Sequence, residues 1–295
     1  KSESEIITLF YDKFADIPLL SRMDAVAETF IDEIETLLNR DLPEEERIPL
    51  IEKFQKMYET MDFYVLYNRF LKKEGYQTLP RRPLEKRKLR YEDVYPVLYL
   101  KYRLSRQAER SNIKHLVIDE MQDYSRLQYL IIRRMFSCKM TILGDRAQTM
   151  ADQQQDVLQF LPGIFGKDLR RIEMRKSYRN TVEIASYAAN LIGVTDLELF
   201  ERHGMPVLER DVTDLEAALR EAVDTLFPDE KTYETAAVIV PDEKTAERAY
   251  LILREILAEK DFDCGKRLSW LNRDSSSFKK GLTVTTFYLA KGLEF

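Results

Sequence analysis

Four short apolar runs in the second part of the chain constrain its fold more than any other feature. Helical patterns separate most of them, and the runs are residues 116–118, 140–143, 236–240 and 282–287. Uninterrupted apolar strands that alternate with helices are typical of a parallel sheet with helices covering both faces. The sequence therefore predicts an α/β fold from about residue 113 onward.

The chain before residue 113 carries a different pattern. Apolar residues recur there at three- and four-residue spacing, as in Ala25–Leu38 and Ile48–Tyr58, and no run has the character of a strand. We therefore expect a helical region over residues 1–112. With 295 residues, of which 44% are hydrophobic, the chain is long enough for two domains and a further small element.

Charge and rare residue types narrow the class of protein. The net charge is -5, whereas proteins that grip nucleic acid unaided are usually basic. Cys138 and Cys264 are the only cysteines, which excludes a disulfide framework and favours a reducing, cytoplasmic setting. No apolar run is long enough to cross a bilayer, so we expect no membrane association. The chain starts at Lys1 and stops inside a motif at Phe295, so we expect it to be a segment of a longer protein.

Residues 80–90, PRRPLEKRKLR, hold six basic side chains and one acidic side chain. Runs of like charge are usually solvated, so one interpretation of this segment is an exposed linker. The other interpretation is a contact site for phosphates or for an acidic partner. The sequence leaves both interpretations open.

Acidic side chains follow two of the predicted strands where each strand ends. Asp119 and Glu120 come directly after residues 116–118, and Asp145 follows residues 140–143 by one glycine. Ligands bind beyond the carboxyl ends of parallel strands, and carboxylates gathered there repel one another unless a cation intervenes. Mg²⁺ takes one or two carboxylates with water and phosphate oxygens, which suits Asp119 as its holder through water. Glu120 is then free to orient and deprotonate an attacking water, as a nucleoside triphosphatase requires.

A simpler interpretation is that the Asp-Glu pair only ends a strand and caps the next helix. Ser125 followed by Gln128 is a capping-box pattern, which predicts that a helix begins there. Because an isolated Asp-Glu pair is common, the choice depends on the motifs around it.

Four segments of this region form a set of motifs. They are DEMQD at 119–123, GDRAQ at 144–148, SYRN at 177–180 and TFYLAKGLEF at 286–295. In order and spacing they resemble motifs II, III, IV and V of the superfamily 1 helicases of the UvrD/Rep/PcrA type. KGLEF after a strand is the most specific of the four, and the resemblance covers about residues 113–295.

The resemblance implies RecA-like P-loop NTPase lobes with parallel sheets, preceded by the helical region. Residues 113–170 then correspond to the C-terminal part of domain 1A, and residues 171–295 to domain 2A. Residues 1–112 fit an insertion in the first motor domain. In the family, ATP and Mg²⁺ bind between the two domains, and binding and hydrolysis close and open the cleft.

The resemblance also implies roles for individual side chains. Gln148 would sense the γ-phosphate or the attacking water, Tyr178 would stack on a base, and Arg179 would stabilise the transferring phosphoryl group. Glu294 would contact the ribose. Gly292 would lie in the nucleotide-binding turn, although it fits a purely structural turn equally well. Without the motifs, Tyr178 would be interpreted as a packed ring and Arg179 as a member of a surface ion pair.

Three positions differ from the usual family pattern. Ser177 replaces an asparagine, Tyr288 replaces a histidine, and Met150 lies where an aromatic ring stacks on single-stranded DNA. The methionine argues against strand translocation. The form YLAKGLEF, together with RYEDVYPVLYLKYRL at residues 90–104, is similar to the HelD branch, whose members bind RNA polymerase and help free it from nucleic acid. RNA polymerase and DNA are therefore the partners that the resemblance implies.

The phosphate-binding pattern GxxxxGK[ST] does not occur in the sequence. The two Gly-Lys pairs belong to GKD at 166–168 and GKR at 265–267, and neither has the required spacing. Because ATP phosphates need that backbone cradle, we expect negligible hydrolysis by this segment alone and activity in the parent protein. The leading hypothesis is a segment of an ATP-dependent, HelD-like motor that remodels RNA polymerase–nucleic acid complexes. The alternatives are a UvrD/Rep-type DNA helicase and a non-catalytic module that docks on a partner.

Overall fold

A computed structural model gives the fold of the chain in two compact units, Lys1–Arg175 and Lys176–Phe295. It describes residues 2–105, 112–145, 148, 156–166, 169–226, 234–260, 267–275 and 280–295. Met150 and the third and fourth residues of the GDRAQ motif, Arg146 and Ala147, lie outside these ranges. Within them, no helix combines the length and apolar content needed to cross a lipid bilayer.

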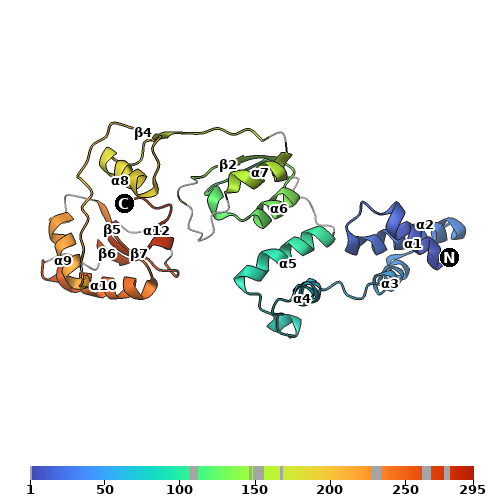
Figure 1. Cartoon of the computed structure of the whole chain (residues 1–295). Coiled ribbons are helices and arrows are strands. Elements are labelled where there is room, and N and C mark those ends of the chain that lie inside the picture. Colours follow the sequence, from blue (N-terminus) through green and yellow to red (C-terminus); the bar gives the residue numbers. More distant parts are fainter. Residues whose placement is uncertain are drawn as a thin grey trace. The chain divides into compact units, whose positions relative to one another are not determined.

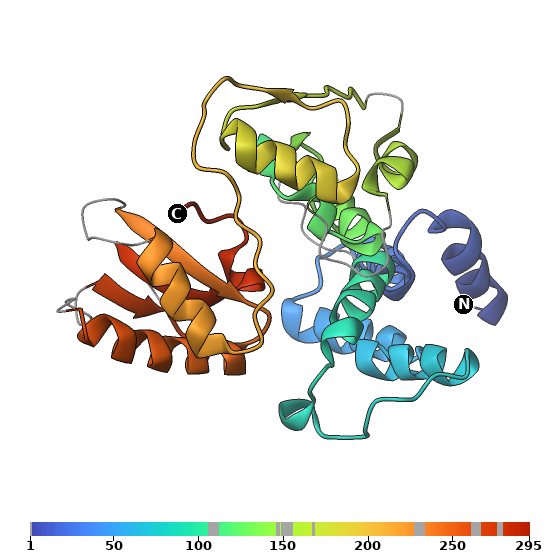
Figure 2. The ribbon, with the colours of Figure 1, turned by 60° about the vertical axis from the view of Figure 1, so that its left-hand side comes forward.

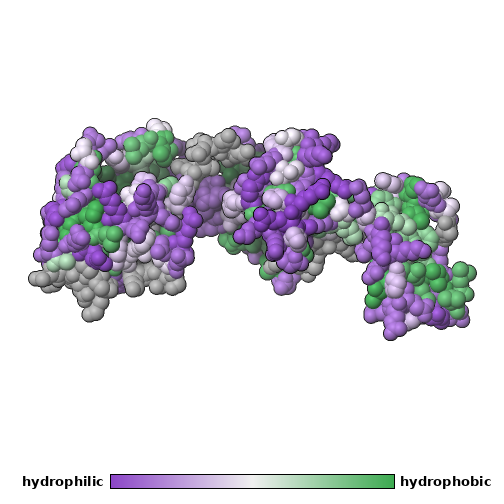
Figure 3. All heavy atoms as spheres, turned by 90° about the horizontal axis from the view of Figure 1, so that it is seen from below, coloured by the Kyte–Doolittle hydropathy of each residue, from purple (hydrophilic) through white to green (hydrophobic). Residues whose placement is uncertain are grey.

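Helices form the first unit as far as residue 104, as the apolar spacing predicts (Figure 1). They are α1 (Glu3–Thr8), α2 (Arg22–Leu38), α3 (Glu44–Gln55), α4 (Phe63–Lys73) and α5 (Tyr91–Leu104), with a π-helical turn at Leu9–Lys13 and 3-10 turns at Leu19–Ser21 and Leu84–Lys86. Helix α2 contacts α3 and buries Val26, Ala27 and Ile31. Other large apolar side chains of these first helices stay on the surface, including Leu37 and Ile48. Apolar patches are visible among the polar surface in Figure 3.

Helices α4 and α5 share a small core that encloses one buried carboxylate. Tyr67 lies in this core, and its hydroxyl donates a hydrogen bond of 2.8 Å to Asp93 Oδ1. Arg90 Nε donates to Asp93 Oδ2 at 2.6 Å. Burial alone would raise the pKa of Asp93, but these two donors hold it below its ordinary value. Burial and the neighbouring carboxylate raise the pKa of Tyr67 to about 12.

The first parallel strand pair follows these helices. Strand β1 (His115–Ile118) pairs with β2 (Lys139–Ile142), with His115 opposite Lys139. Helices α6 (Arg126–Met135) and α7 (Val157–Phe165) pack on the face of the pair that holds Ile118. Val117 points to the other face and remains 60% exposed, so the described residues cover this pair on one face and not on both. The prediction of two covered faces is wrong for β1, because both packed helices use the same side.

The second unit contains a three-stranded sheet with β7 in the middle. Its order is β5-β7-β6, formed by Thr235–Val240, Gly281–Thr286 and Leu268–Trp270, and both pairings are parallel. Every residue of β7 is buried, as its uninterrupted apolar and β-branched run predicts. Helices α9 (Leu215–Leu226) and α10 (Glu243–Ala258) lie side by side and pack on this sheet (Figures 1 and 2).

A second, two-stranded pairing opens this unit. Strand β3 (Lys176–Ser177) pairs in parallel with β4 (Glu198–Leu199), and α8 (Val182–Ile192) connects them. The unit ends with the short helix α12 (Phe287–Ala290) directly after β7. Every strand pair among the described residues is parallel, which confirms the predicted class of an α/β fold with parallel sheets.

Candidate functional site

Two chain segments meet at the carboxyl ends of β1 and β2. The backbone N–H of Leu143 donates to the Ile118 carbonyl at 2.8 Å, and the N–H of Met121 donates to the Leu143 carbonyl at 2.8 Å. The parallel pairing thus continues past both strands. It brings the segment after β1, which carries Asp119 and Glu120, against the segment after β2, which carries Asp145.

Gly144 is the residue that permits this approach. A Cβ atom built at Gly144 would lie 2.5 Å from Gln122 Oε1, 2.5 Å from Met121 Cγ and 2.6 Å from the Met121 backbone nitrogen. These distances are far below ordinary contact, so any side chain here would push the two segments apart. The glycine of GDRAQ therefore has a local cause, which is close packing against DEMQD.

Side-chain amides connect the acidic groups of the two segments. Gln122 Nε2 donates to Glu120 Oε2 at 2.5 Å, and Gln122 Oε1 accepts the backbone N–H of Asp145 at 3.1 Å. Gln148 Nε2 in turn donates to Asp145 Oδ2 at 2.9 Å. The result is a hydrogen-bonded chain, Glu120–Gln122–Asp145–Gln148, which we call the strand-end network. Sequence reasoning gave Gln122 no role, although its place in DExQD was a signal.

Glu120 has an unusual backbone. Its φ of 52° and ψ of 50° are left-handed, a conformation that side chains other than Gly, Asn and Asp rarely adopt. The Glu120 N–H donates to Asp119 Oδ1 at 2.8 Å, and this bond helps to hold the turn. Strained residues of this kind cost about 1–3 kcal/mol and gather at functional sites. Glu120 is half-buried, whereas Asp119 is exposed.

A buried tyrosine on α6 holds the turn that follows β1. Tyr129, on α6, has no exposed surface, and its hydroxyl donates to the Met121 carbonyl at 3.0 Å. Burial raises the pKa of Tyr129, so this hydroxyl stays a donor. The predicted capping box at the start of α6 is confirmed, because Gln128 N donates to Ser125 Oγ and Ser125 N donates to Gln128 Oε1. The sequence did not reveal Tyr129 as an anchor.

The site suits a cation held mainly by water and phosphate oxygens. No three acidic, histidine or cysteine side chains of the described ranges gather closely enough to hold a metal ion among themselves. Asp119 Oδ1 accepts the Glu120 N–H, and the described residues give Oδ2 no partner. One carboxylate oxygen of this kind fits Mg²⁺, which takes few protein ligands and keeps several waters.

In the second unit, Tyr178 and Arg179 follow β3. The Tyr178 ring lies 5.7 Å from the Phe200 ring between centroids, and Lys176 Nζ lies 5.6 Å from the Tyr178 ring centre. Tyr178 is nevertheless 60% exposed, so much of its ring remains available for stacking.

The segment after Arg179 is fixed to a neighbouring loop. Thr181 caps α8, and the N–H of Val182 donates to the Arg202 carbonyl at 2.9 Å. One Glu183 oxygen lies 2.9 Å from His203 Nδ1, and the other accepts the Gly204 N–H at 2.9 Å. The histidine contact and the backbone donor lower the pKa of Glu183 to about 2. These contacts hold the start of α8 in place directly after the motif.

The end of the chain reaches the same motif. After α12, the chain turns at Gly292, whose φ of 81° suits glycine, and Leu293 N donates to the Ala290 carbonyl at 3.0 Å. Glu294 Oε1 then lies 2.7 Å from Arg179 Nε, with 66% of each side chain exposed. The structure thus joins two predicted site residues, Arg179 and Glu294, as an ion pair. Exposed pairs of this kind contribute about 0–1 kcal/mol, so either partner is easily released.

Comparison with known proteins gives a family match for most of the first unit. Residues 5–150 match the family model of the UvrD/REP helicase N-terminal domain. The matched range contains helices α2 to α6, the end of α1, the strands β1 and β2 and the whole strand-end network. The match supports a superfamily 1, UvrD-like helicase, a family that usually uses ATP and Mg²⁺ and acts on nucleic acid. No curated protein matches the chain.

Proposed function

We propose that the chain supplies part of the nucleotide-hydrolysing site of a superfamily 1 motor. The strand-end network carries this proposal, because it links two carboxylates and two amides at the ligand-binding edge of a parallel strand pair. A network that only ended a strand would not need the left-handed backbone at Glu120 or the close approach at Gly144. Both features point to side chains that must be positioned for chemistry.

The residues of the first unit divide the work as follows. Asp119 would hold Mg²⁺ through water, and the bound ion would neutralise charge on the triphosphate. Glu120, oriented by Gln122, accepts the proton of the attacking water. Gln148 contacts the γ-phosphate or that water as a neutral amide, and Asp145 holds Gln148 in place.

The residues of the second unit contact the base, the ribose and the transferring phosphoryl group of the nucleotide. The exposed face of Tyr178 stacks on the base, and Glu294 accepts hydrogen bonds from the ribose at the turn shaped by Gly292. Arg179 stabilises the transferring phosphoryl group with its planar guanidinium. The weak pair between Arg179 and Glu294 supports these roles, because releasing both side chains to a ligand costs little.

The proposal is tested with Glu120→Gln in the parent protein. Loss of a general base costs typically 10²–10⁴-fold in rate, and loss of a phosphoryl-stabilising arginine costs about 10³–10⁵-fold. We expect losses in these ranges for Glu120→Gln and for Arg179→Ala. Glu44→Gln, an exposed carboxylate in the first turn of α3, is the control and should leave the rate unchanged. Equal rates for Glu120→Gln and the unchanged protein would contradict the assignment.

We further propose that the motor belongs to the HelD branch and remodels RNA polymerase–nucleic acid complexes. The sequences YLAKGLEF and RYEDVYPVLYLKYRL support this, the latter spanning Arg90 and α5. A pull-down of the parent protein against RNA polymerase and single-stranded DNA, with salt titrated, separates the alternatives. Retention on the polymerase supports the HelD branch, retention on DNA alone supports a UvrD/Rep-type helicase, and an inactive protein that still binds a partner supports a docking module.

The sequence holds no GxxxxGK[ST] run, so residues 1–295 alone should show negligible ATP hydrolysis. Phosphate release by this segment at a rate similar to that of the parent protein would contradict the proposal.

A further inference from the structure

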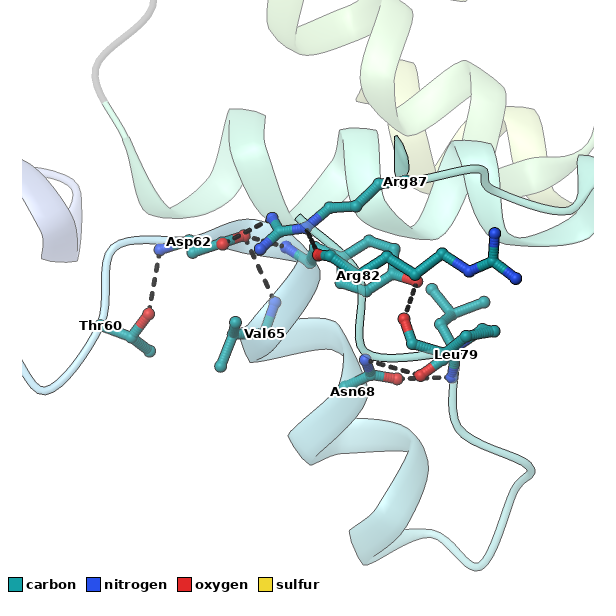
Figure 4. A network of polar contacts seen from close by, with 9 residues as sticks. Thr60, Asp62, Val65, Asn68, Leu79, Arg82 and Arg87 are labelled. Atoms are coloured by element: carbon teal, nitrogen blue, oxygen red, sulfur yellow. Dashed lines mark hydrogen bonds and ion pairs between the residues drawn. The ribbon is translucent and has the colours of Figure 1, made fainter. Parts of the chain in front are cut away.

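The basic segment 80–90 is a fixed loop and not a free linker. Arg87 Nη1 contacts Asp62 Oδ2 at 2.6 Å, and its Nε donates to the Arg82 carbonyl at 3.0 Å. The Arg87 guanidinium also lies over the Tyr64 ring, 4.8 Å from its centre. Figure 4 shows Arg87 reaching from the loop to Asp62 at the start of α4. One arginine therefore closes the loop on itself and attaches it to a helix.

Further contacts attach the loop at its beginning and its end. Asn68 on α4 makes two hydrogen bonds with the Leu79 backbone, at 2.6 and 3.2 Å (Figure 4). The Tyr64 hydroxyl donates to the Pro80 carbonyl at 2.7 Å. At the other end, Arg90 pairs with the buried Asp93. Two prolines and the 3-10 turn Leu84–Lys86 restrict the backbone between these anchors.

The charged side chains of four other basic residues in the loop take no part in this attachment. They are Arg81, Arg82, Lys86 and Lys88, all exposed. None of them makes an ion pair with any residue in the described ranges, and in Figure 4 the Arg82 guanidinium points away from the contacts that hold the loop. The only acidic side chain between Arg81 and Arg90 is the exposed Glu85. The fold thus uses Arg87 and Arg90 for structure and leaves a dense positive charge facing solvent.

We propose that this loop, residues 80–90, is a binding site for the sugar–phosphate backbone of a nucleic acid. The whole chain has a net charge of -5, so the loop is a local exception that attracts a polyanion. Phosphates recur every 3.4 Å along a strand, which suits four cations within eight residues. Because the backbone is already fixed, binding orders only side chains and costs less entropy.

Two observations favour a nucleic acid over an acidic protein. A strand of nucleic acid presents its charges at a regular 3.4 Å repeat, which suits closely spaced cations such as the adjacent Arg81 and Arg82. The loop also lies within residues 5–150, the range that matches a helicase domain. It shares no residue with the strand-end network, so binding at the loop can be measured without nucleotide and does not depend on hydrolysis.

The experiment measures binding of the full chain to a fluorescent DNA duplex and to a single strand by anisotropy, from 50 to 200 mM salt. Four phosphate contacts predict a slope of log K against log salt of about -3.6 for duplex and about -2.8 for single strand. A quadruple variant should weaken binding at least tenfold and remove most of that slope. It carries Arg81→Gln, Arg82→Gln, Lys86→Gln and Lys88→Gln. These side chains have no partners among the described residues, so circular dichroism and thermal unfolding should not change.

A matched pair of double variants controls for net charge. Lys86→Gln with Lys88→Gln should reduce the slope by about 1.8 for duplex. Lys53→Gln with Lys56→Gln removes the same charge from exposed positions at and beside the C-terminal end of α3 and should leave the slope unchanged. Equal effects of the two pairs would overturn the proposal, as would the absence of binding at 50 mM salt. Displacement of DNA by polyglutamate at equal charge concentration would also overturn it, in favour of an acidic protein.

Discussion

Replacing Gly144 by alanine should separate the two segments that form the strand-end network. The new Cβ would start 2.6 Å from the Met121 nitrogen, whereas ordinary contact begins at 3.4 Å. The atoms it meets include backbone and a hydrogen-bonded amide, neither of which can turn away freely. The segments must therefore move apart, and the bond from Met121 N to the Leu143 carbonyl is the first to lengthen.

The cost of this change follows from two terms. Overpacking of a filled site costs about 1–3 kcal/mol, and one lost hydrogen bond adds about 0.5–1.5 kcal/mol. We expect the first unit to lose about 2–4 kcal/mol, which lowers its urea midpoint by about 1–2 M at a slope near 2 kcal/mol/M. Hydrogen exchange of the amides of Met121 and Leu143 should accelerate by a factor of about 30 or more.

The chain supplies two internal controls for this measurement. Gly163→Ala adds the same methyl group within α7, where the Cβ would meet nothing within 4 Å, and should be neutral or stabilising. Trp270 is the only tryptophan and lies in the second unit, so its fluorescence should report an unchanged transition. If Gly144→Ala left the far-UV transition and the exchange of Met121 unchanged, the proposed close contact would be refuted.

Two further predictions concern buried and titrating groups. Asp93→Ala leaves the buried Tyr67 hydroxyl without its acceptor and should cost the first unit about 2–4 kcal/mol, whereas Tyr67→Phe should cost about 1 kcal/mol. In urea unfolding, the double variant should lose less free energy of unfolding than the two single variants lose in sum. Fully additive losses would argue against the contact between the two side chains. The pKa of Glu183 is lowered to about 2, so its contacts stabilise α8 fully above its ordinary pKa of 4.5 and are lost as the pH falls toward 2. The protection factors of the α8 amides, which correct for the intrinsic pH dependence of exchange, should fall over that interval and should depend less on pH in Glu183→Gln; identical pH profiles of the protection factors would contradict the assignment.

The strands and several helices could be predicted from the sequence because local patterns encode them. The run 116–118 lies within β1, and the capping box from Ser125 to Gln128 marks the start of α6. The side chain of Asp242 caps α10 by accepting the N–H of Thr245. Each of these features depends on residues only a few positions apart, where propensity and side-chain period act directly.

The geometry of the site could not be predicted in the same way. The bridge from Gln122 to Asp145 joins residues more than twenty positions apart, and the hydrogen bond from Tyr129 to Met121 depends on how α6 packs. The left-handed backbone at Glu120 opposes local preference, which favours glycine or asparagine there. The basic segment was equally ambiguous, because a count of charges does not show that Arg87 and Arg90 are used internally.

At Glu120, the left-handed backbone makes the residue that is best for stability different from the residue that is needed for activity. Glycine adopts that conformation without steric penalty, so Glu120→Gly would relieve about 1 kcal/mol of backbone strain while deleting the carboxylate proposed as the base. Laboratory selection of the parent protein for heat resistance alone would thus enrich an inactive protein, and any screen for robust variants needs turnover as a second criterion.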